Sequence, residues 1–450
     1  MAFRWRLTLG MLALVMSSRP SAAQSTAQVP LEFDFLNPGA RSVALGGAFA
    51  AVADDATAAF TNPAGLTQLG APEISFEPRL LVTDSRYFAG GRISGLPTQQ
   101  GPDTVSGPVY GTDTDTRVVP SFLSGVFPTR RWAVAAYYQQ QSRTNNTLLN
   151  QGAFERLTFA GETTDAARDD ALEGTRRISV ASVGTSVGVQ ITPSFALGAG
   201  AVFQRLTLDS SFTRYGYTTT LFGPFDRNRV SAQQTQSGRD YGVGWQFGGS
   251  KNFGATLRVG AVVRLGAALN FEQIDTSAEI GRVDRVGQFR VPDVISLGTM
   301  WRPRDTLAIV GEVSRVGYSR LKQDYVSFQT LAAGSDAQVK LDDAYEVHGG
   351  FEWTLVRSEP HISPVFRFGA WYDPGHAVRY EKTSDAPGEL RLAAALPGTT
   401  GRFHYSGGIG WPQSSRFEIN GAADVSSRSL TLSASIIVRF IRRPPSTPTP

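Results

Sequence analysis

The residues with the clearest potential for chemistry are two acids and a histidine near residue 350. Glu346, His348 and Glu352 all occupy even positions, so a β-strand would place them on one face. A histidine between two carboxylates could act as a general base. The same residues could instead belong to a network of solvated charges around a water-filled space. We favour this second interpretation.

Other patterns for catalysis or metal binding are weak. The chain has no cysteine, which removes disulfides, thiolate metal sites and cysteine nucleophiles. Its four histidines, at positions 348, 361, 376 and 404, lack the spacing of metal ligands, and no glycine-rich phosphate loop is found. We therefore expect a protein that is not an enzyme and that needs no cofactor or metal.

An acidic pair near the N-terminus is a further candidate. Asp54 and Asp55 could bind calcium, but calcium prefers about six or more oxygen ligands. Carboxylates held inside a protein are more commonly paired with arginine. We therefore expect Asp54 and Asp55 to pair with arginines that point inward, such as Arg367 or Arg416.

The segments that carry these residues alternate between apolar and polar side chains. In Leu430–Phe440 every even residue is apolar, and Phe417–Val425 shows a similar alternation. One apolar face and one charged face suit a strand between lipid and a hydrated lumen, although a β-sandwich would show the same period. On the lumen face we expect a charge network made of Glu346, His348, Glu352, Arg367, Arg416 and Glu418.

Short and long connections alternate along the chain, which decides between these folds. Short turns with Pro, Gly or Asn follow Phe127, Gln190, Lys251, Trp301, Leu355 and Trp411. The polar stretches between them are expected to be loops: Asp84–Thr116, Ser142–Thr175, Ser210–Gly238, Asp275–Val291, Ser319–Asp342 and Pro374–Gly401. A soluble domain rarely needs several loops of this length. The pattern predicts an all-β fold, a transmembrane antiparallel β-barrel of about 14 strands.

Tryptophans mark one rim of this barrel. Trp132, Trp301, Trp353 and Trp411 lie within a few residues of a short turn. Indole favours the membrane–water interface, so these residues predict an aromatic girdle at the periplasmic rim, where short turns lie. Trp371, about one strand length beyond a turn, is expected near the opposite rim. Burial in an ordinary hydrophobic core is the alternative explanation.

The first residues have the features of an export signal. Met1–Ala23 combines Arg4 and Arg6, an apolar run and a small-residue cleavage site before Gln24. The leader contributes three of the arginines and no acid, so the formal charge of +4 falls to +1 in the mature chain. This balance gives no reason to expect nucleic-acid binding. No run of eighteen apolar residues follows, so a barrel is the expected way of crossing a bilayer.

The region before the barrel differs from the strands. Leu31–Leu69 is rich in small residues, contains two Asn-Pro turns and shows no strand alternation. It is too small to form its own core, so we expect it to fill the barrel lumen as a plug. The expected domains are a signal peptide (1–23), a hatch or plug (24–70), the barrel (71–440) and a disordered Pro-rich tail (441–450).

Three motifs in the expected plug resemble those of a known family. Gly46-Gly47-Ala48, Ala53-Asp54-Asp55-Ala56 and Asn62-Pro63-Ala64 are similar to the hatch of the FadL/TodX family of outer-membrane transporters, and Pro292–Gly298 resembles the opening of a family strand. The family implies fourteen strands and passive uptake of long-chain fatty acids or aromatic hydrocarbons. Its hatch implies gating roles for Asn62, Pro63, Ala64, Asp54 and Asp55.

The resemblance also suggests how solutes pass and which partners to expect. Loop aromatics would capture hydrophobic molecules, and a gap between strands could release them sideways: Tyr87, Phe88, Tyr215, Tyr217, Phe222, Phe225, Tyr325 and Phe328. These rings could instead only pack the loops together. The expected partners are fatty acids, hydrocarbons, detergents and outer-membrane lipids, with a monomer in the outer membrane of a Gram-negative bacterium. The alternative is a barrel of this family that binds proteins, as the PorV subunit of type IX secretion does.

Overall fold

The computed structural model describes residues 35, 37–159, 161–218, 220–278, 281–321, 338–356 and 363–441. The expected signal peptide, nearly all of the expected tail, Tyr325, Phe328 and His361 lie outside these residues. No helix in the described ranges is long and apolar enough to cross a membrane.

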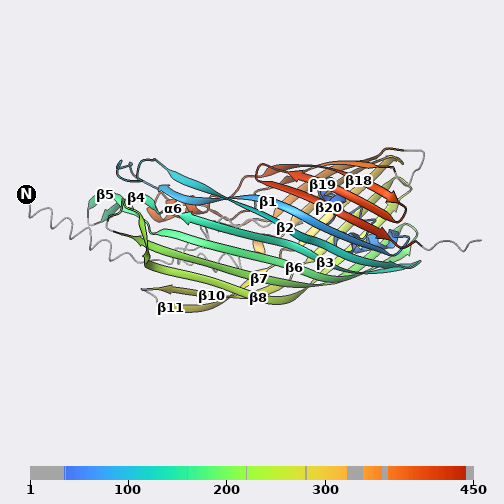
Figure 1. The fold of residues 1–450 in the computed structure, drawn as a ribbon, viewed down its shortest axis with the longest axis horizontal. Helices are drawn as coiled ribbons and strands as arrows, with labels where there is room; N and C mark the ends of the chain where they lie inside the picture. The colour runs from blue at the N-terminus through green and yellow to red at the C-terminus, as the bar shows by residue number, and fades with distance from the viewer. Residues whose placement is uncertain are drawn as a thin grey trace, which may run out of the picture.

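Fourteen antiparallel strands form a closed barrel, as the alternation of the sequence predicted (Figure 1). The last strand pairs with the first, so the sheet has no free edge. The strands of the wall are β1 (Glu73–Arg92), β2 (Pro108–Pro128), β3 (Trp132–Asn150), β6 (Ala171–Thr192), β7 (Phe195–Tyr217), β8 (Phe225–Phe253), β9 (Leu257–Leu265), β12 (Val294–Arg304), β13 (Leu307–Val316), β15 (Ala344–Thr354), β16 (Val365–Asp373), β18 (Arg402–Ser414), β19 (Phe417–Val425) and β20 (Ser429–Arg439).

The outer face of the wall carries an apolar belt. Large apolar side chains that point outward are exposed on every wall strand, while polar residues such as Gln246 and Asn420 are buried toward the lumen. The tryptophans Trp132, Trp301, Trp353 and Trp411 lie outward near the short turns, where the girdle was expected. At the other edge of the belt the outward aromatics are Phe203, Tyr241, Tyr345, Tyr372, Phe403 and Tyr405.

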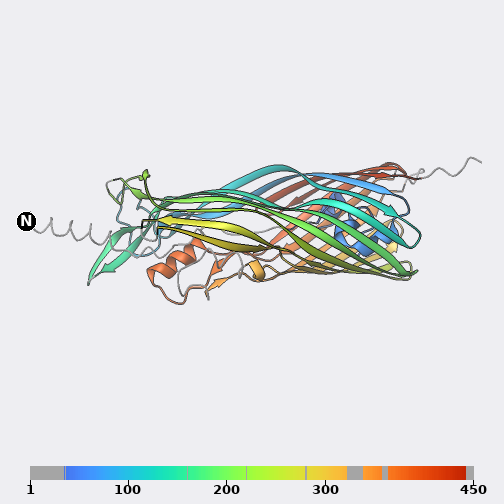
Figure 2. The ribbon, with the colours of Figure 1, turned by 90° about the horizontal axis from the view of Figure 1, so that it is seen from below.

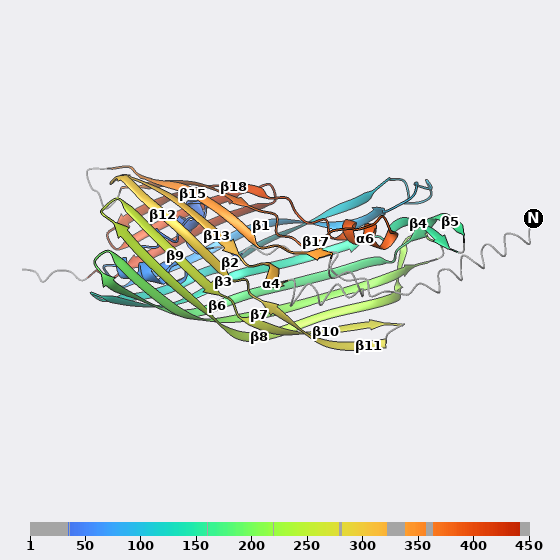
Figure 3. The ribbon, with the colours of Figure 1, turned by 180° about the vertical axis from the view of Figure 1, so that it is seen from behind.

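The wall is much taller on one side than on the other. β6, β7 and β8 have 22, 23 and 29 residues, whereas β12, β13, β15 and β16 have 9 to 11 residues each, seen from behind in Figure 3. The tall side is extended by β4 (Ala153–Phe159), β5 (Glu162–Arg168), β10 (Ala268–Ser277) and β11 (Gly281–Arg290). Above the short strands, α4 (Ser319–Leu321), β14 (Val339–Lys340) and β17 (Arg379–Tyr380) pack against inward apolar side chains of the tall wall, and α6 (Pro387–Ala395) packs against β1 and β4.

The tall side corrects four of the expected loops. Most of Asp84–Thr116, Ser142–Thr175, Ser210–Gly238 and Asp275–Val291 is β-strand. The reason is that a strand outside the membrane needs no apolar row toward lipid, and many of its inward residues are buried amides and hydroxyls, so its composition resembles that of a loop. Amide and hydroxyl side chains then link neighbouring strands, as in Ser210 to Gln236 at 3.0 Å and Gln236 to Gln273 at 2.8 Å.

One ladder of the wall stops while both of its strands continue. β2 and β3 pair from Pro128 and Ala133 only as far as Phe122 and Gln139. Beyond that point β2 still pairs with β1, and β3 still pairs with β6. The wall therefore has a break between β2 and β3 above the middle of the belt. We call this the β2–β3 gap.

Residues 37–70, which we call the N-terminal segment, lie inside the barrel near its short-turn end (Figures 1 and 2). They form α2 (Ala40–Ala44), α3 (Ala58–Thr61) and the 3-10 helix η1 (Pro63–Gln68). Their free backbone amides donate to carboxylates of the wall: Gly39 to Glu77 at 2.7 Å, Phe49 and Ala50 to Glu312 at 2.8 Å, and Ala56 to Glu73 at 2.8 Å. Short helices leave such amides unpaired, so the wall supplies the acceptors that the segment lacks.

Glycines of the wall allow this segment to approach closely. A Cβ at Gly260 of β9 would lie 2.1 Å from the carbonyl oxygen of Ala50, whereas a Cβ at Gly421 of β19 would meet nothing within 4 Å.

We expect Gly260→Leu to push the N-terminal segment away from the wall and to leave the barrel closed, because the ladder hydrogen bonds do not involve side chains. Overpacking of this kind typically costs about 1–3 kcal/mol. Single-channel conductance in planar bilayers should rise, and the heated and unheated protein should still migrate differently on a gel. Gly421→Leu is the matched control. Equal conductance of the two variants would contradict the tight packing of the segment.

Candidate functional site

A cavity of about 70 Å³ lies in the lumen directly above the N-terminal segment. Ser42, Val43, Gly46 and Gly47 of the segment form its floor. Its sides combine apolar and aromatic residues with about as many polar and charged ones, among them Val294, Val316, Tyr318, Trp371, Arg264, Glu346, His348 and Asp424. A cavity of this size is well below the roughly 300–1,000 Å³ of typical ligand pockets, so a larger ligand would enter only if side chains moved.

An aromatic column stands on one side of this cavity. Trp371 stacks between His348 and His404, with ring centroids 5.3 and 3.9 Å away. The carboxylate of Asp424 accepts a hydrogen bond from the indole Nε1 of Trp371 at 3.0 Å and lies 2.7 Å from Nδ1 of His404. Trp371 was expected near the opposite rim; it points into the lumen and does not belong to a girdle. Its polar N–H finds a buried partner there, which lipid could not offer.

A second cavity, of about 60 Å³, continues from the column to the β2–β3 gap. It shares Trp371, Asp424 and Thr431 with the first cavity. At the gap its lining consists of Asp115, Arg117, Val119, Ser121, Gln140 and Ser142. The two cavities are therefore neighbours, separated by these shared side chains, and lie between the top of the N-terminal segment and the break in the wall. We call them together the lumen chamber.

Polar groups on β2 close the upper end of the gap. The backbone amides of Asn145 and Thr147 in β3, which have lost their ladder partners, donate to the carboxylates of Asp115 and Asp113, both at 3.1 Å. These side chains satisfy amides that would otherwise be unpaired, so the break costs few hydrogen bonds.

The Asn-Pro turn fixes the N-terminal segment to itself and to the wall. The side-chain amide of Asn62 donates to the carbonyls of Ala50 at 2.7 Å and Gly249 at 3.2 Å, and its oxygen accepts from the amide of Ala64 at 3.1 Å. Asn62 thereby caps η1, and Pro63 occupies the first helical position, where no N–H is needed. Ala64 is fully buried.

The acidic pair binds arginines other than the expected ones. Asp54 pairs with Arg41 at 2.5 Å and with Arg302 at 3.5 Å, and Asp55 lies 3.7 Å from Arg41. Arg41 belongs to the segment itself, so the charge is compensated locally. Asp55 also accepts hydrogen bonds from the amide and hydroxyl of Thr57.

The six residues of the expected charge network lie in four separate places. Glu352 joins Arg41 at 2.8 Å to Arg367 at 2.7 Å, and Glu346 lies 3.3 Å from His348. Glu418 pairs with Arg439 at 2.8 Å, below the N-terminal segment. Arg416 is exposed in the turn between β18 and β19 and donates to the carbonyl of Ile441. Only Glu346 and His348 line the lumen chamber.

The expected capture aromatics pack against one another and against loops. Phe88 is buried beside Tyr110, and Tyr215 stacks on Phe225. Tyr217 donates to the carbonyls of Gln151 and Asp169. Phe222 stacks on Phe154, and Tyr87 packs against a small cluster that contains Leu148. None of the described members lines the lumen chamber.

One apparent catalytic motif belongs to the wall. Residues 184–188, GTSVG, have the spacing of a GxSxG nucleophile elbow, which requires a sharp turn from strand to helix. Here they lie in the middle of β6, and the hydroxyl of Ser186 donates to the carbonyl of Ala59 at 2.6 Å. The serine therefore anchors the N-terminal segment.

Ion pairs hold the outermost part of the chain together. Arg92, at the end of β1, pairs with Asp103 in the following loop, and both side chains are buried. Burial alone would raise the pKa of Asp103, but hydrogen bonds from Arg92 and Thr98 lower this pKa below its usual value. The loop is therefore fixed by one ionised carboxylate.

Comparison with known proteins gives matches in structure and none in sequence. No family model and no curated protein matches the chain. Solved structures do match. A Pseudomonas aeruginosa FadL homologue aligns with a TM-score of 0.60 and 13% identity, over 92% of this chain and 100% of that one. The Pseudomonas putida toluene transporter TodX gives 0.57 and 13%, over 91% and 100%, and the monoaromatic hydrocarbon channel CymD gives 0.53 and 15%, over 91% and 100%. The chain has the FadL/TodX fold.

The likeness covers the whole FadL-like barrel, which confirms the fold that the motifs implied. The proteins with this fold are described as a toluene transporter and a hydrocarbon channel, and those descriptions apply to them. At such low identity the comparison supplies no residue roles for the present chain. The roles of the lumen chamber and the gap must be argued from their own geometry.

The Asp103 ion pair leads to a prediction about pH. The pKa of Asp103 is lower in the folded protein than in the unfolded chain. The contribution of Asp103 to the stability of the loop is therefore complete above the unfolded pKa of about 3.9, and it is lost as the pH falls through the folded pKa. We expect pepsin to cleave between residues 93 and 107 only below that point, with sites mapped by mass spectrometry. Asp103→Asn should open the same loop to a neutral protease at pH 7. Asp284→Asn, which removes an exposed ion pair, should not.

Proposed function

We propose that this protein is an outer-membrane channel for the passive uptake of hydrophobic molecules. The observation that carries the proposal is the lumen chamber, two neighbouring cavities that lie between the top of the N-terminal segment and a break in the wall. A solute in this chamber has the segment below it and the β2–β3 gap at its side. The fold shared with hydrocarbon channels supports the same conclusion.

The gap offers a route from the lumen to the lipid. A cavity on the inner side and a groove on the outer side share Asp115, Arg117, Arg143 and Thr144 at this place. Just below, Val118 and Leu123 point outward into the apolar belt. Elsewhere a closed ladder would force a solute to break backbone hydrogen bonds. At the gap those bonds are already absent, so sideways release needs only side-chain movement.

The N-terminal segment acts as a hatch in this proposal. It closes the lumen beneath the chamber, and its Asn62 turn and Arg41 ion pairs keep it in place. A hydrophobic solute gains free energy by entering the bilayer, whereas a path past the hatch would lead it into the aqueous periplasm. The hatch therefore directs the solute toward the gap.

One cation in the chamber bears on the choice of substrate. Arg264 points into the lumen, donates to the side chain of Asn37 at 3.0 Å and lies over the ring of Phe60 at 4.6 Å. Within the described ranges no carboxylate lies within 4.0 Å of it, although Glu312 and Glu346 are near enough to interact with its charge. A guanidinium in this setting is suited to bind the carboxylate of an amphiphilic acid, with the chain along the apolar wall. This favours long-chain fatty acids over hydrocarbons.

Blocking the gap should stop transport. Val119 is buried and lines the chamber at the gap, whereas its neighbour Val118 is 71% exposed on the lipid face. We expect Val119→Trp to lower uptake at least tenfold and Val118→Trp to have little effect. Uptake of labelled oleate and toluene would be measured in cells that lack their own transporters, at equal surface expression. Normal uptake by Val119→Trp would remove the lateral route. Absence of uptake by the unchanged protein for every solute would favour a protein-binding role.

Arg264 should separate the two substrate classes. Arg264→Gln removes the charge and keeps a hydrogen-bond donor for Asn37. A charge-assisted hydrogen bond contributes about 1.5–3 kcal/mol, so oleate affinity should fall about tenfold or more. Toluene has no carboxylate, and its uptake should be unchanged. Equal loss for both solutes would mean that Arg264 only supports the packing around Asn37 and Phe60.

A further inference from the structure

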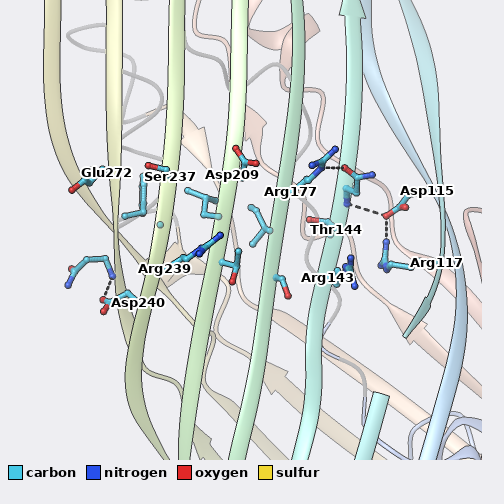
Figure 4. Close-up of a pocket in the computed structure, with 18 of the residues that line it drawn as sticks. Asp115, Arg117, Arg143, Thr144, Arg177, Asp209, Ser237, Arg239, Asp240 and Glu272 are labelled. Carbon is cyan, nitrogen blue, oxygen red and sulfur yellow. Dashed lines mark hydrogen bonds and ion pairs between the residues drawn. The ribbon is translucent and has the colours of Figure 1, made fainter. Parts of the chain in front are cut away.

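The outer face of the tall wall carries a polar groove of about 1060 Å³ (Figure 4). It crosses β2, β3, β6, β7, β8 and β10 and begins where the apolar belt ends. In β8, for example, Arg239 follows two positions beyond Tyr241, which is 67% exposed. If the protein lies in an outer membrane, as proposed above, this groove is at the level of the lipid headgroups on the cell surface.

Three exposed arginines stand in the groove without acidic partners. Arg143, Arg177 and Arg239 form no ion pair with a carboxylate among the described residues, and Arg177 donates only to the side chain of Asn145. Two of the nearby acids are already used by the wall. Asp115 accepts from Arg117 and the amide of Asn145, and Asp240 accepts from the amide of Asn270.

The register of the strands sets the spacing of these cations. One row of outward residues runs from Arg143 through Ser179 and Thr207 to Arg239. Three strand spacings separate its ends, which is about 14 Å. Arg177 stands in the next row, diagonal to Arg143 and directly opposite Asp209 of β7, with which it forms no ion pair. The groove thus has a cation at each end and two hydroxyls between them.

The carboxylates of Asp209 and Glu272 lie in the next row outward, with Ser237 between them. They lower the positive potential of the groove, so a simple anion would be held weakly. A ligand with two separated phosphates could reach both ends of the row, where the arginines are. Divalent cations could join its phosphates to the two carboxylates.

We propose that this groove binds a glycolipid whose headgroup is a glucosamine disaccharide with a phosphate at each end, the lipid A type that forms the outer leaflet of Gram-negative outer membranes. Arg143 and Arg177 hold one phosphate, and Arg239 holds the other. Guanidinium groups match phosphate oxygens in paired hydrogen bonds. Ser179 and Thr207 face the sugars, and the acyl chains lie on the apolar belt below. The bound lipid would stand next to the β2–β3 gap.

The test uses the full-length protein in detergent. Bisphosphorylated lipid A is added, and binding is measured by native mass spectrometry. We expect the triple variant Arg143→Gln, Arg177→Gln, Arg239→Gln to bind at least tenfold more weakly. The control changes Arg227, Arg229 and Arg282 to Gln, which removes the same charge from exposed side chains outside the groove. The control should bind as the unchanged protein does.

Two other ligands test the chemistry. Monophosphorylated lipid A should bind more weakly than the bisphosphorylated form. Excess inorganic phosphate should not displace the bisphosphorylated form. If phosphatidylglycerol bound as tightly as bisphosphorylated lipid A, the disaccharide assignment would be wrong. If the triple variant bound lipid A as tightly as the unchanged protein, the assignment of the site would be wrong. Solute uptake is measured separately: its absence together with intact, arginine-dependent lipid binding would contradict the proposed transport alone.

Discussion

The structure depends on the pairing of backbone hydrogen bonds where no water can replace them. A closed antiparallel sheet meets this requirement at every strand, because each edge has a neighbour. The β2–β3 ladder is an exception, and its cost is limited by position and by side chains. It lies where the belt gives way to polar residues. Asp113 and Asp115 accept hydrogen bonds from the backbone amides of β3 that no longer pair with the backbone of β2. The proposed exit is therefore located where the constraint is weakest.

The same requirement explains how the N-terminal segment is held. Its helices are too short to satisfy their own amides, and the lumen would leave them unpaired. Glu73, Glu77 and Glu312 accept hydrogen bonds from these amides, so these wall carboxylates serve the structure rather than transport. Gly260 then lets the backbone of Ala50 come close to the wall. These hydrogen bonds fix the position of the segment, and buried apolar side chains such as Phe49, Phe60 and Leu66 pack it against the wall.

The sequence was sufficient to predict the barrel but not to predict the height of its wall. Alternation around a membrane is strong because lipid selects apolar residues on one face, so the fourteen strands and the four tryptophans near the turns could be predicted. Outside the membrane no face meets lipid, and strands such as the first half of β8 have the composition of a loop. Residue pairs were harder still. Asp54 pairs with Arg41, thirteen positions away, and Trp371 with Asp424, and neither follows from spacing along a strand.

The tall wall has a consequence for how the entrance meets a solute. An entrance made of mobile loops must become ordered when it binds, and each ordered residue costs about 1–2 kcal/mol in backbone entropy. Here much of the entrance is continuous sheet: β8 alone has 29 residues, about three times the 9–11 that a bilayer requires. The shape of this part of the mouth exists before any solute arrives. Binding there loses little chain entropy, so even a weakly attracted molecule can be retained long enough to move inward.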